Sequence, residues 1–267
     1  MYDKAKLDKL SGNDSTSRIS YTPSLLKFNG SRGAFSLVEK TEKGYSEPTP
    51  LTTPLKVSLL RPRRICGWYE KTPDGKSISY FTNEHNNYAD MLTLFSAEKG
   101  SKAKVVDTGT SSSLYEKYPL LRTSIVLYVL YDDVVHKLKI KGRSLKSFKK
   151  YREDLEKDGK AFYDFETSLD SKKEESQTFD FYSVVFSAEK ETDFDKVGPV
   201  IEEVGTILNK IDEQHALNAI VSQDDVSASQ GDASQPEVNT GEEVINVDEE
   251  PETLDSSDEI KVENIPF

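Results

Sequence analysis

Residues 124–141 read Ser-Ile-Val-Leu-Tyr-Val-Leu-Tyr-Asp-Asp-Val-Val-His-Lys-Leu-Lys-Ile-Lys, and no other stretch of the chain indicates the fold so clearly. Over 124–131, β-branched, aromatic and aliphatic residues occupy both faces of an extended chain, a pattern typical of a buried central strand. Asp132 and Asp133 then interrupt the apolar run and predict a tight turn. A second strand is predicted over 134–141, so this stretch indicates a β-hairpin.

The second strand of this hairpin has different chemistry on its two faces. Because side chains alternate along a strand, Lys137, Lys139 and Lys141 lie on one face. Leu138 and Ile140 lie on the other. Such a row of lysines can follow the phosphates of a nucleic acid. It is equally compatible with a solvated face or with protection of a sheet edge.

A helix is predicted directly after this strand, over residues 144–157. Ser144 can cap its start, and apolar side chains recur on one face. Arg143 and Lys146 lie at the beginning of the helix and extend the row of cations that starts in the preceding strand. These two residues therefore join the lysines as candidates for contact with phosphate.

The rest of the body is predicted to consist mainly of short strands. Gly, Pro, Asn and Asp separate the apolar segments, and residues 72–76, Thr-Pro-Asp-Gly-Lys, give the clearest signal of a tight hairpin. A charged turn is predicted at 170–175, and the helical spacing of apolar residues predicts a closing helix over 198–220. The further strands are predicted at 33–40, 55–60, 64–70, 77–82, 91–96, 161–168 and 178–187.

A second set of candidate binding residues surrounds the predicted hairpin at 72–76. Binding to a single strand of nucleic acid requires cations near the phosphates and flat side chains on which bases stack. By strand alternation Arg64, Cys66 and Trp68 share one face, which would place the only tryptophan beside a guanidinium. Trp68 and Tyr69 can equally be core residues. The candidates in this region are Arg61, Arg63, Arg64, Trp68, Tyr69, Tyr80 and Phe81.

Charge is distributed very unevenly along the chain. The 267 residues carry a formal net charge of -12, but residues 221–267 alone contain 14 acidic residues and one lysine, a net charge of -13. Removing them from the 35 basic and 47 acidic residues of the chain leaves 34 and 33 for residues 1–220, a net charge of +1. The acidic overall composition therefore belongs to the end of the chain and does not exclude a body that binds nucleic acid.

Several functional classes lack their usual signals in this sequence. Cys66 is the only cysteine, which excludes an intrachain disulfide and a thiolate zinc cluster and indicates a reducing compartment. The three histidines have no metal-site spacing, and no phosphate-binding loop or nucleophile motif is present. The longest apolar run, 125–131, is too short to cross a membrane. We therefore expect a cytoplasmic protein that is not an enzyme and uses no metal, cofactor or membrane.

The end of the chain carries its most specific motif. Residues 221–267 lack the apolar content to form a core and are expected to be disordered, and they end in Ile265-Pro266-Phe267. An acidic segment with this ending resembles the C-terminal tip of bacterial single-stranded DNA-binding proteins. In that family the tip docks on replication, recombination and repair enzymes, which here would use the Phe267 ring and its carboxylate. The chain departs from the family where residues 261–264, Lys-Val-Glu-Asn, replace consecutive aspartates.

The resemblance covers only this tail, and the larger body is more similar in size to binding proteins encoded by phages. It implies a protein that coats single-stranded DNA without sequence preference and recruits partner proteins through its tip. We therefore expect a mainly β (α+β) fold with an OB-fold-like barrel and one or two helices. The expected organisation is an N-terminal arm at 1–24, a DNA-binding domain at 25–220 and a disordered acidic tail at 221–267.

Two further points stay open at the level of sequence. An adaptor that uses the tip to engage replication or repair enzymes without binding DNA would carry the same tail. Self-association is also compatible with the sequence, which does not specify an oligomeric state. Because a bacterial-type tip is involved, the expected setting is the cytoplasm of a bacterial or phage-infected cell.

Overall fold

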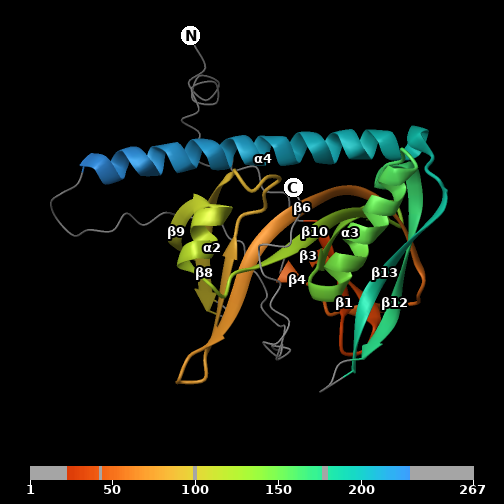
Figure 1. Cartoon of the computed structure of the whole chain (residues 1–267), viewed down its shortest axis with the longest axis horizontal. Coiled ribbons are helices and arrows are strands. Elements are labelled where there is room, and N and C mark those ends of the chain that lie inside the picture. The colour runs from red at the N-terminus through yellow and green to blue at the C-terminus, as the bar shows by residue number, and fades with distance from the viewer. Residues whose placement is uncertain (1–22, 42–43, 99–100, 176–179, 229–267) are drawn as a thin grey trace, which may run out of the picture.

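The structure, a computed structural model, describes residues 23–41, 44–98, 101–175 and 180–228 (Figure 1). These residues form a mainly β fold with three α-helices, which confirms the predicted α+β class. The strands are β1 Ser24–Asn29, β2 Ala34–Val38, β3 Lys40–Thr41, β4 Gly44–Tyr45, β5 Thr49–Leu51, β6 Leu55–Lys71, β7 Ser77–Thr82, β8 Met91–Glu98, β9 Lys104–Thr110, β10 Arg122–Tyr131, β11 Val134–Ile140, β12 Phe165–Glu175 and β13 Asp180–Glu191. The helices are α2 Ser111–Lys117, α3 Gly142–Lys157, α4 Phe194–Ala228 and the 3-10 turn η1 Phe162–Asp164.

One eleven-stranded sheet contains every strand except the β3–β4 pair. Its strand order is β5-β2-β1-β11-β10-β6-β7-β8-β9. Outside this order, β12 pairs with β6, and β13 pairs with β12. The predicted hairpin at 124–141 is confirmed as β10 and β11, and Asp132 and Asp133 both have positive φ in the turn between them. Over the described residues the sheet does not close, so the expected OB-fold-like barrel is not established.

Strand β6 connects the two halves of the sheet. The sequence predicts two strands here, at 55–60 and 64–70, but the structure has one strand of 17 residues. Pro62 cannot donate a backbone hydrogen bond. It is tolerated because, on the edge of β6 that faces away from β10, it lies between the segment paired with β12 and the bridge to His85. On that edge β12 pairs with β6 up to Ser58, and Arg64 forms the next bridge, to His85. The strand therefore continues through a proline that would interrupt a strand paired along both edges.

A bulge at Leu60 decides which face of the sheet each β6 side chain occupies. In the pairing with β10, Leu59 is opposite Val129 and Arg61 is opposite Tyr128, so Leu60 is the extra residue. Leu59 is then buried in the cluster under α3, while Leu60 is buried in the cluster under α4. The bulge thus turns the side chain of Arg61 toward α4.

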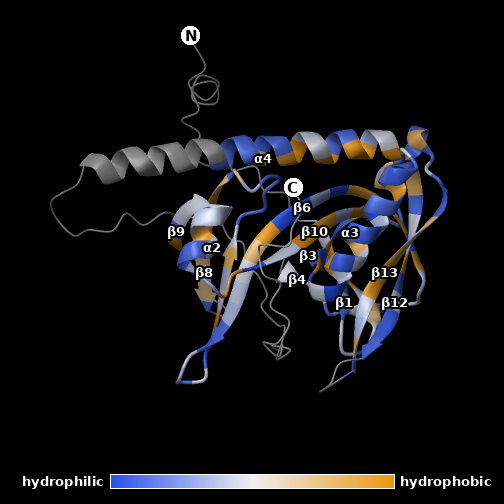
Figure 2. Ribbon diagram, viewed as in Figure 1, coloured by the Kyte–Doolittle hydropathy of each residue, from blue (hydrophilic) through white to orange (hydrophobic). Residues whose placement is uncertain are grey.

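Three hydrophobic clusters hold the helices on the sheet. The largest lies between α3 and strands of the β1–β11–β10–β6 half and includes Phe148 and Phe186. A second packs α4 on β6 and β10, and a third packs α2 on β8 and includes Cys66 and Leu114. Figure 1 shows α4 along one side of the molecule, spanning both halves. In Figure 2 apolar residues follow the middle of the sheet, whereas the turn between β6 and β7 is hydrophilic.

Other element boundaries correct the expectations from sequence. Residues 170–175, predicted as a turn, belong to β12. Helix α3 begins at Gly142 and has no side-chain cap; Ser144, predicted as the cap, is buried and accepts a 2.8 Å hydrogen bond from the Val184 backbone. Helix α4 continues past 220, the predicted end of the domain, to Ala228. Most of the predicted arm and most of the tail, with its Ile265-Pro266-Phe267 tip, lie outside the described residues.

Candidate nucleic-acid interface

The sheet formed by β6–β9 has two faces with different surroundings. Arg61, Arg63 and Ile65 contact α4, and we call their side the α4 face. Cys66 packs with α2 on the opposite side, the α2 face. Because side chains alternate along β6, Gly67 continues the α4 face and Trp68 continues the α2 face. The predicted binding residues are divided between these two faces.

On the α2 face, Trp68 is stacked against protein rings. Its indole lies 4.1 Å from the ring of Tyr80, with 2° between the planes, and 5.5 Å from the ring of Tyr118. Cys66 beside it is fully buried, and burial raises the pKa of its thiol. Trp68 itself is half-buried and packs against this cluster of buried residues, and its stacking on Tyr80 and Tyr118 already uses ring surface that a base would need. We leave Trp68 and Tyr80 out of the interface described below.

Two of the three arginines in β6 bind α4. Arg63 is 1 % exposed and donates to both carboxylate oxygens of Asp212, at 2.7 and 2.5 Å, and to the Glu84 carbonyl at 2.8 Å. Burial lowers the pKa of Arg63, but the hydrogen bond and charge of Asp212 outweigh it and the pKa is raised. Arg61 donates to Asn209 at 3.1 Å. Arg63 is therefore inaccessible to a ligand, which corrects its prediction, whereas the half-buried Arg61 hydrogen-bonds α4 and its contact with DNA stays a prediction.

Arg64 and Lys137 are also engaged by neighbouring groups. The Arg64 guanidinium donates to the Asn86 carbonyl at 2.6 Å and lies 4.4 Å above the ring of Tyr88, which is 50 % exposed. Lys137 forms a 2.9 Å ion pair with Glu84, and both side chains are mostly buried. Glu84 thus already compensates Lys137, one of the predicted phosphate contacts, whereas Arg64 borders an exposed ring.

The α4 face carries a second set of rings beyond the contacts of α4. Phe81 of β7 lies directly opposite Phe95 of β8, and their ring centroids are 5.6 Å apart with 26° between the planes. Tyr69 is on the same face and hydrogen-bonds Ser77. All three rings are half-buried, so each presents part of its surface to solvent. Trp68 and Tyr80 are half-buried as well, so the two faces differ in ring contacts and not in exposure: the indole has two ring neighbours, whereas Phe81 and Phe95 are stacked on each other.

Strand register connects this ring pair to cations. Gly67 lies between Phe81 on one side and Arg122 of β10 on the other. Directly opposite residues share a face of a sheet, so the Arg122 side chain belongs to the α4 face. Gly67 is required here, because a Cβ would lie 2.5 Å from the Tyr80 carbonyl oxygen. The missing side chain leaves a gap on this face between Arg122 and Phe81.

The exposed lysines of β11 lie on the same face. Lys139 is opposite Val126, a member of the α4 cluster, and two residues further Lys141 is still extended. Continuing the pairing of β10 with β11 by one residue places Lys141 opposite Ser124. Ser124 is two residues from Arg122 in β10, so Lys141 and Arg122 are diagonal neighbours about 7–8 Å apart. We call this set the cation–aromatic row. It consists of Lys139, Lys141, Arg122, Phe81 and Phe95.

No known protein family, curated protein or solved structure matches the chain. The case for a function therefore depends on the geometry of this surface and on the tail motif. The row crosses five adjacent strands, from β11 to β8, which at about 4.8 Å per strand is roughly 19 Å. That length can accommodate several nucleotides of a single strand.

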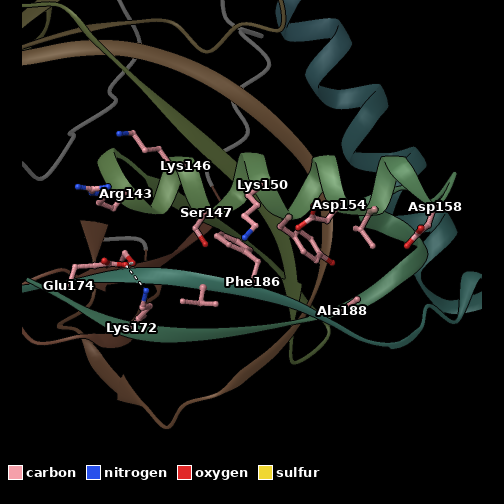
Figure 3. A pocket seen from close by; sticks show the side chains of 14 residues that line it. Arg143, Lys146, Ser147, Lys150, Asp154, Asp158, Lys172, Glu174, Phe186 and Ala188 are labelled. Atoms are coloured by element: carbon pink, nitrogen blue, oxygen red, sulfur yellow. Dashed lines mark hydrogen bonds and ion pairs between the residues drawn. The ribbon is translucent and has the colours of Figure 1, made fainter. Parts of the chain in front are cut away.

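The remaining predicted residues, Arg143 and Lys146, lie at a groove of about 650 Å³ between α3 and the β12–β13 pair (Figure 3). Elsewhere, no three acidic, histidine or cysteine residues among those described are placed to hold a metal ion. No helix in the described part of the chain is long and apolar enough to span a membrane.

Two members of the row were missed at the level of sequence. Phe95 lies in the predicted strand at 91–96 and is one of many strand aromatics, so nothing local distinguishes it. Arg122 precedes the apolar run of β10, and only its pairing with Gly67 brings it near Phe81. Pairing the two strands on either side of the predicted 72–76 hairpin places Gly67 opposite Phe81. No local pattern in the sequence pairs Gly67 with Arg122.

Proposed function

We propose that the protein is a sequence-nonspecific single-stranded DNA-binding protein that coats and protects single strands during replication, recombination and repair. The observation that carries this proposal is the cation–aromatic row, in which exposed cations and a half-buried ring pair follow one another on one face of the sheet. Phosphates would lie along Lys139, Lys141 and Arg122, and bases would stack on Phe81 and Phe95.

The row favours single strands over duplex DNA. Its rings offer flat surfaces, and only unpaired, splayed bases can present a face to them. It contains no arrangement that reads base edges, since the residues near the rings are Gly67 and a guanidinium that already donates to the Pro119 and Leu121 carbonyls. Recognition through stacking and phosphate charge tolerates any sequence.

For the fold, we propose that β1, β11, β10, β6, β12 and β13 act as an OB-like barrel. The order of these strands is continuous in the sheet. A 2.6 Å hydrogen bond from the Tyr182 backbone to the Gly30 carbonyl brings the start of β13 to the turn between β1 and β2. This contact supports an approach of the two ends of the barrel, although no strand pairing joins them in the described residues.

We further propose that the acidic segment recruits replication, recombination and repair proteins through Ile265-Pro266-Phe267. The supporting observation is the sequence motif itself, with 14 acidic residues in 221–267. Acidic residues guide the segment to basic rims on a partner, and the apolar tip supplies an anchor. The proposed setting is the cytoplasm of a bacterial or phage-infected cell.

A titration of labelled oligo(dT) and of a duplex of the same length, followed by fluorescence anisotropy, tests the proposal. Oligo(dT) is expected to bind more tightly, and its affinity should fall steeply as salt is raised, because cations on the protein release counterions from the phosphates. Equal affinity for the two forms contradicts stacking on the row. Absence of binding to either form, with capture of repair enzymes retained, identifies the adaptor instead.

A further inference from the structure

The groove between α3 and the β12–β13 pair has a basic half and an acidic half. Figure 3 shows Arg143 and Lys146 at one end of α3, Lys150 directed into the groove and Asp154 and Asp158 toward the other end. Lys172 of β12 faces the basic half from the opposite wall. The cations thus gather at the end of the groove where β11 leads into α3.

Neighbouring groups neutralise some of these charges. Glu174 pairs with Lys172 at 3.7 Å and accepts a 3.0 Å hydrogen bond from Ser183. Asp154 pairs at 2.8 Å with Lys157, which does not line the groove. Among the described residues, Lys146 and Lys150 have no ion-pair partner, and both are exposed. Lys157 and, more weakly, Lys150 lower the pKa of Asp154, so Lys150 is partly engaged by that carboxylate, whereas Lys146 is available to an external anion.

The floor of the groove favours phosphate over a peptide. The two rings that line it, Tyr151 and Phe186, are 8 % and 7 % exposed. Its half-buried apolar residues are the smaller Leu155 and Val185, so it offers no large apolar surface to anchor a peptide side chain. Exposed ammonium groups bind phosphate oxygens as point charges without needing an apolar contact. An extended polyanion therefore matches the basic half of the groove best.

The groove is close to the cation–aromatic row along the chain but lies on the other face of the sheet. Helix α3 packs on Leu138 and Ile140, whereas Lys139 is opposite Val126 of the α4 cluster. Lys141, the row's member nearest to α3, directly precedes the helix, and Lys146 and Lys150 follow on its first turns. At 1.5 Å per residue, Lys141 and Lys150 are about 14 Å apart along the axis. A bound strand that follows the cations from Lys139 to Lys150 would therefore pass around the end of β11, from the α4 face to the face covered by α3.

We propose that the sugar-phosphate backbone of the bound single strand leaves the row at Lys141 and enters the basic half of the groove, where Lys146 and Lys150 contact phosphates. This inference rests on the proposed function and extends its binding site. The track of cations ends toward Asp154 and Asp158, because this half of the groove offers carboxylates in place of cations along its α3 wall. The protein then has two successive subsites, rings for bases and a groove for backbone only.

The test compares oligo(dT) of about 6 nucleotides, which fits the row alone, with oligo(dT) of about 16 nucleotides, which reaches the groove as well. Lys146→Ala/Lys150→Ala should weaken binding of the long oligonucleotide by roughly 25-fold at 0.1 M salt and reduce its salt slope by about 1.4, because two phosphate contacts are lost. Binding of the short oligonucleotide should not change.

Lys149→Ala provides the matched control, because Lys149 lies on the same helix, is equally exposed and does not line the groove. It should leave both affinities nearly unchanged. If the double variant weakens both lengths equally, or neither, the groove is not a subsite, although the proposed function stands as long as the short oligonucleotide binds the wild type. If wild-type protein binds neither length, the proposed function fails and this inference fails with it.

Discussion

The two faces of the β6–β9 sheet both carry aromatic residues, but they use them differently. On the α2 face, Trp68 is stacked on Tyr80 and contacts Tyr118. On the α4 face, Phe81 and Phe95 stack on each other and remain half-buried. Both sets are half-buried, but Trp68 has two ring neighbours while Phe81 and Phe95 have each other, and we expect the second set to accept a base. The number of rings on a face therefore says less about binding than the partners those rings already have.

The positions of the two helices explain the difference. Helix α2 and the residues after it cover the α2 face, where Leu114 and Leu121 are fully buried against Cys66. Helix α4 crosses the other face at Arg61 and Arg63. Hydrogen bonds from Arg61 to Asn209 and from Arg63 to Asp212 fix its position there. Gly67 and Phe81 lie beyond this crossing. The arginines of β6 thus hold α4 at a place that leaves the ring pair open.

The largest expected effect concerns the stability of the α2 face. Trp68→Ala should lower the free energy of unfolding by roughly 3 kcal/mol or more, because it removes a ring that stacks on Tyr80 and packs against the buried cluster of Cys66 and Leu114. Denaturant unfolding measures this change. The folded fraction should bind oligo(dT) as the wild type does; a stable variant with weakened binding would reverse the roles of the two faces.

Next in size is the fastening of α4. Asp212→Ala removes the partner of a buried guanidinium and should cost about 3 kcal/mol of stability. Asn209→Ala removes one of the two hydrogen-bond acceptors of Arg61, which is more exposed than Arg63, and should lower the free energy of unfolding by about 1 kcal/mol. Thermal unfolding of both variants checks this order. Equal, small losses would mean that Arg63 does not fix the position of α4.

A smaller effect separates the lysines of β11. Lys139→Ala/Lys141→Ala should reduce the salt slope of oligo(dT) binding by about 1.4, since two phosphate contacts are removed. Lys137→Ala should leave the slope unchanged, because Glu84 already pairs with this lysine. Titrations at several salt concentrations distinguish the two. A change of slope in the Lys137 variant would return that residue to the interface.

The smallest effect is a loss of stability at mildly acidic pH. Burial lowers the pKa of both His85 and His136 from the ordinary 6.5, which favours the neutral imidazole in the folded protein. Between the lowered pKa and 6.5 the unfolded chain binds more protons, so stability is full above 6.5 and falls as pH decreases. Unfolding midpoints at about pH 7.5 and about pH 5.5 measure the loss. His85→Gln should show less of it, and an unchanged pH dependence would contradict the assignment.

Local patterns in the sequence predict the regular parts of this fold well. The boundaries of β7 and the β10–β11 hairpin follow from alternation and from turn residues, and both signals lie within a few residues. Continuity of β6 through Pro62 could not be predicted, because it depends on which strands pair with each edge. The pair β9 and α2 was missed, since 104–117 is a polar stretch with few apolar repeats.

The candidate site shows the same division between local and distant causes. Alternation places Cys66 and Trp68 on one face, yet their packing depends on α2, which lies far from them in sequence. Arg63 reads as a surface cation until Asp212, far away in sequence, is brought to it by α4. The sequence shows the chemical type of each side chain. Whether a ligand can reach that side chain depends on contacts that form only in the folded chain.

The central claim, that bases stack on the α4 face, is tested most directly by Phe81→Ala/Phe95→Ala. Tyr163→Ala serves as the control, because Tyr163 is a 41 % exposed ring in η1 outside the row. With both variants shown to be folded by circular dichroism, affinity for oligo(dT) is measured by anisotropy at fixed salt. The double variant should lose roughly 2–6 kcal/mol of binding free energy with its salt slope unchanged, while the control binds as the wild type does. Wild-type affinity in the folded double variant would contradict the claim.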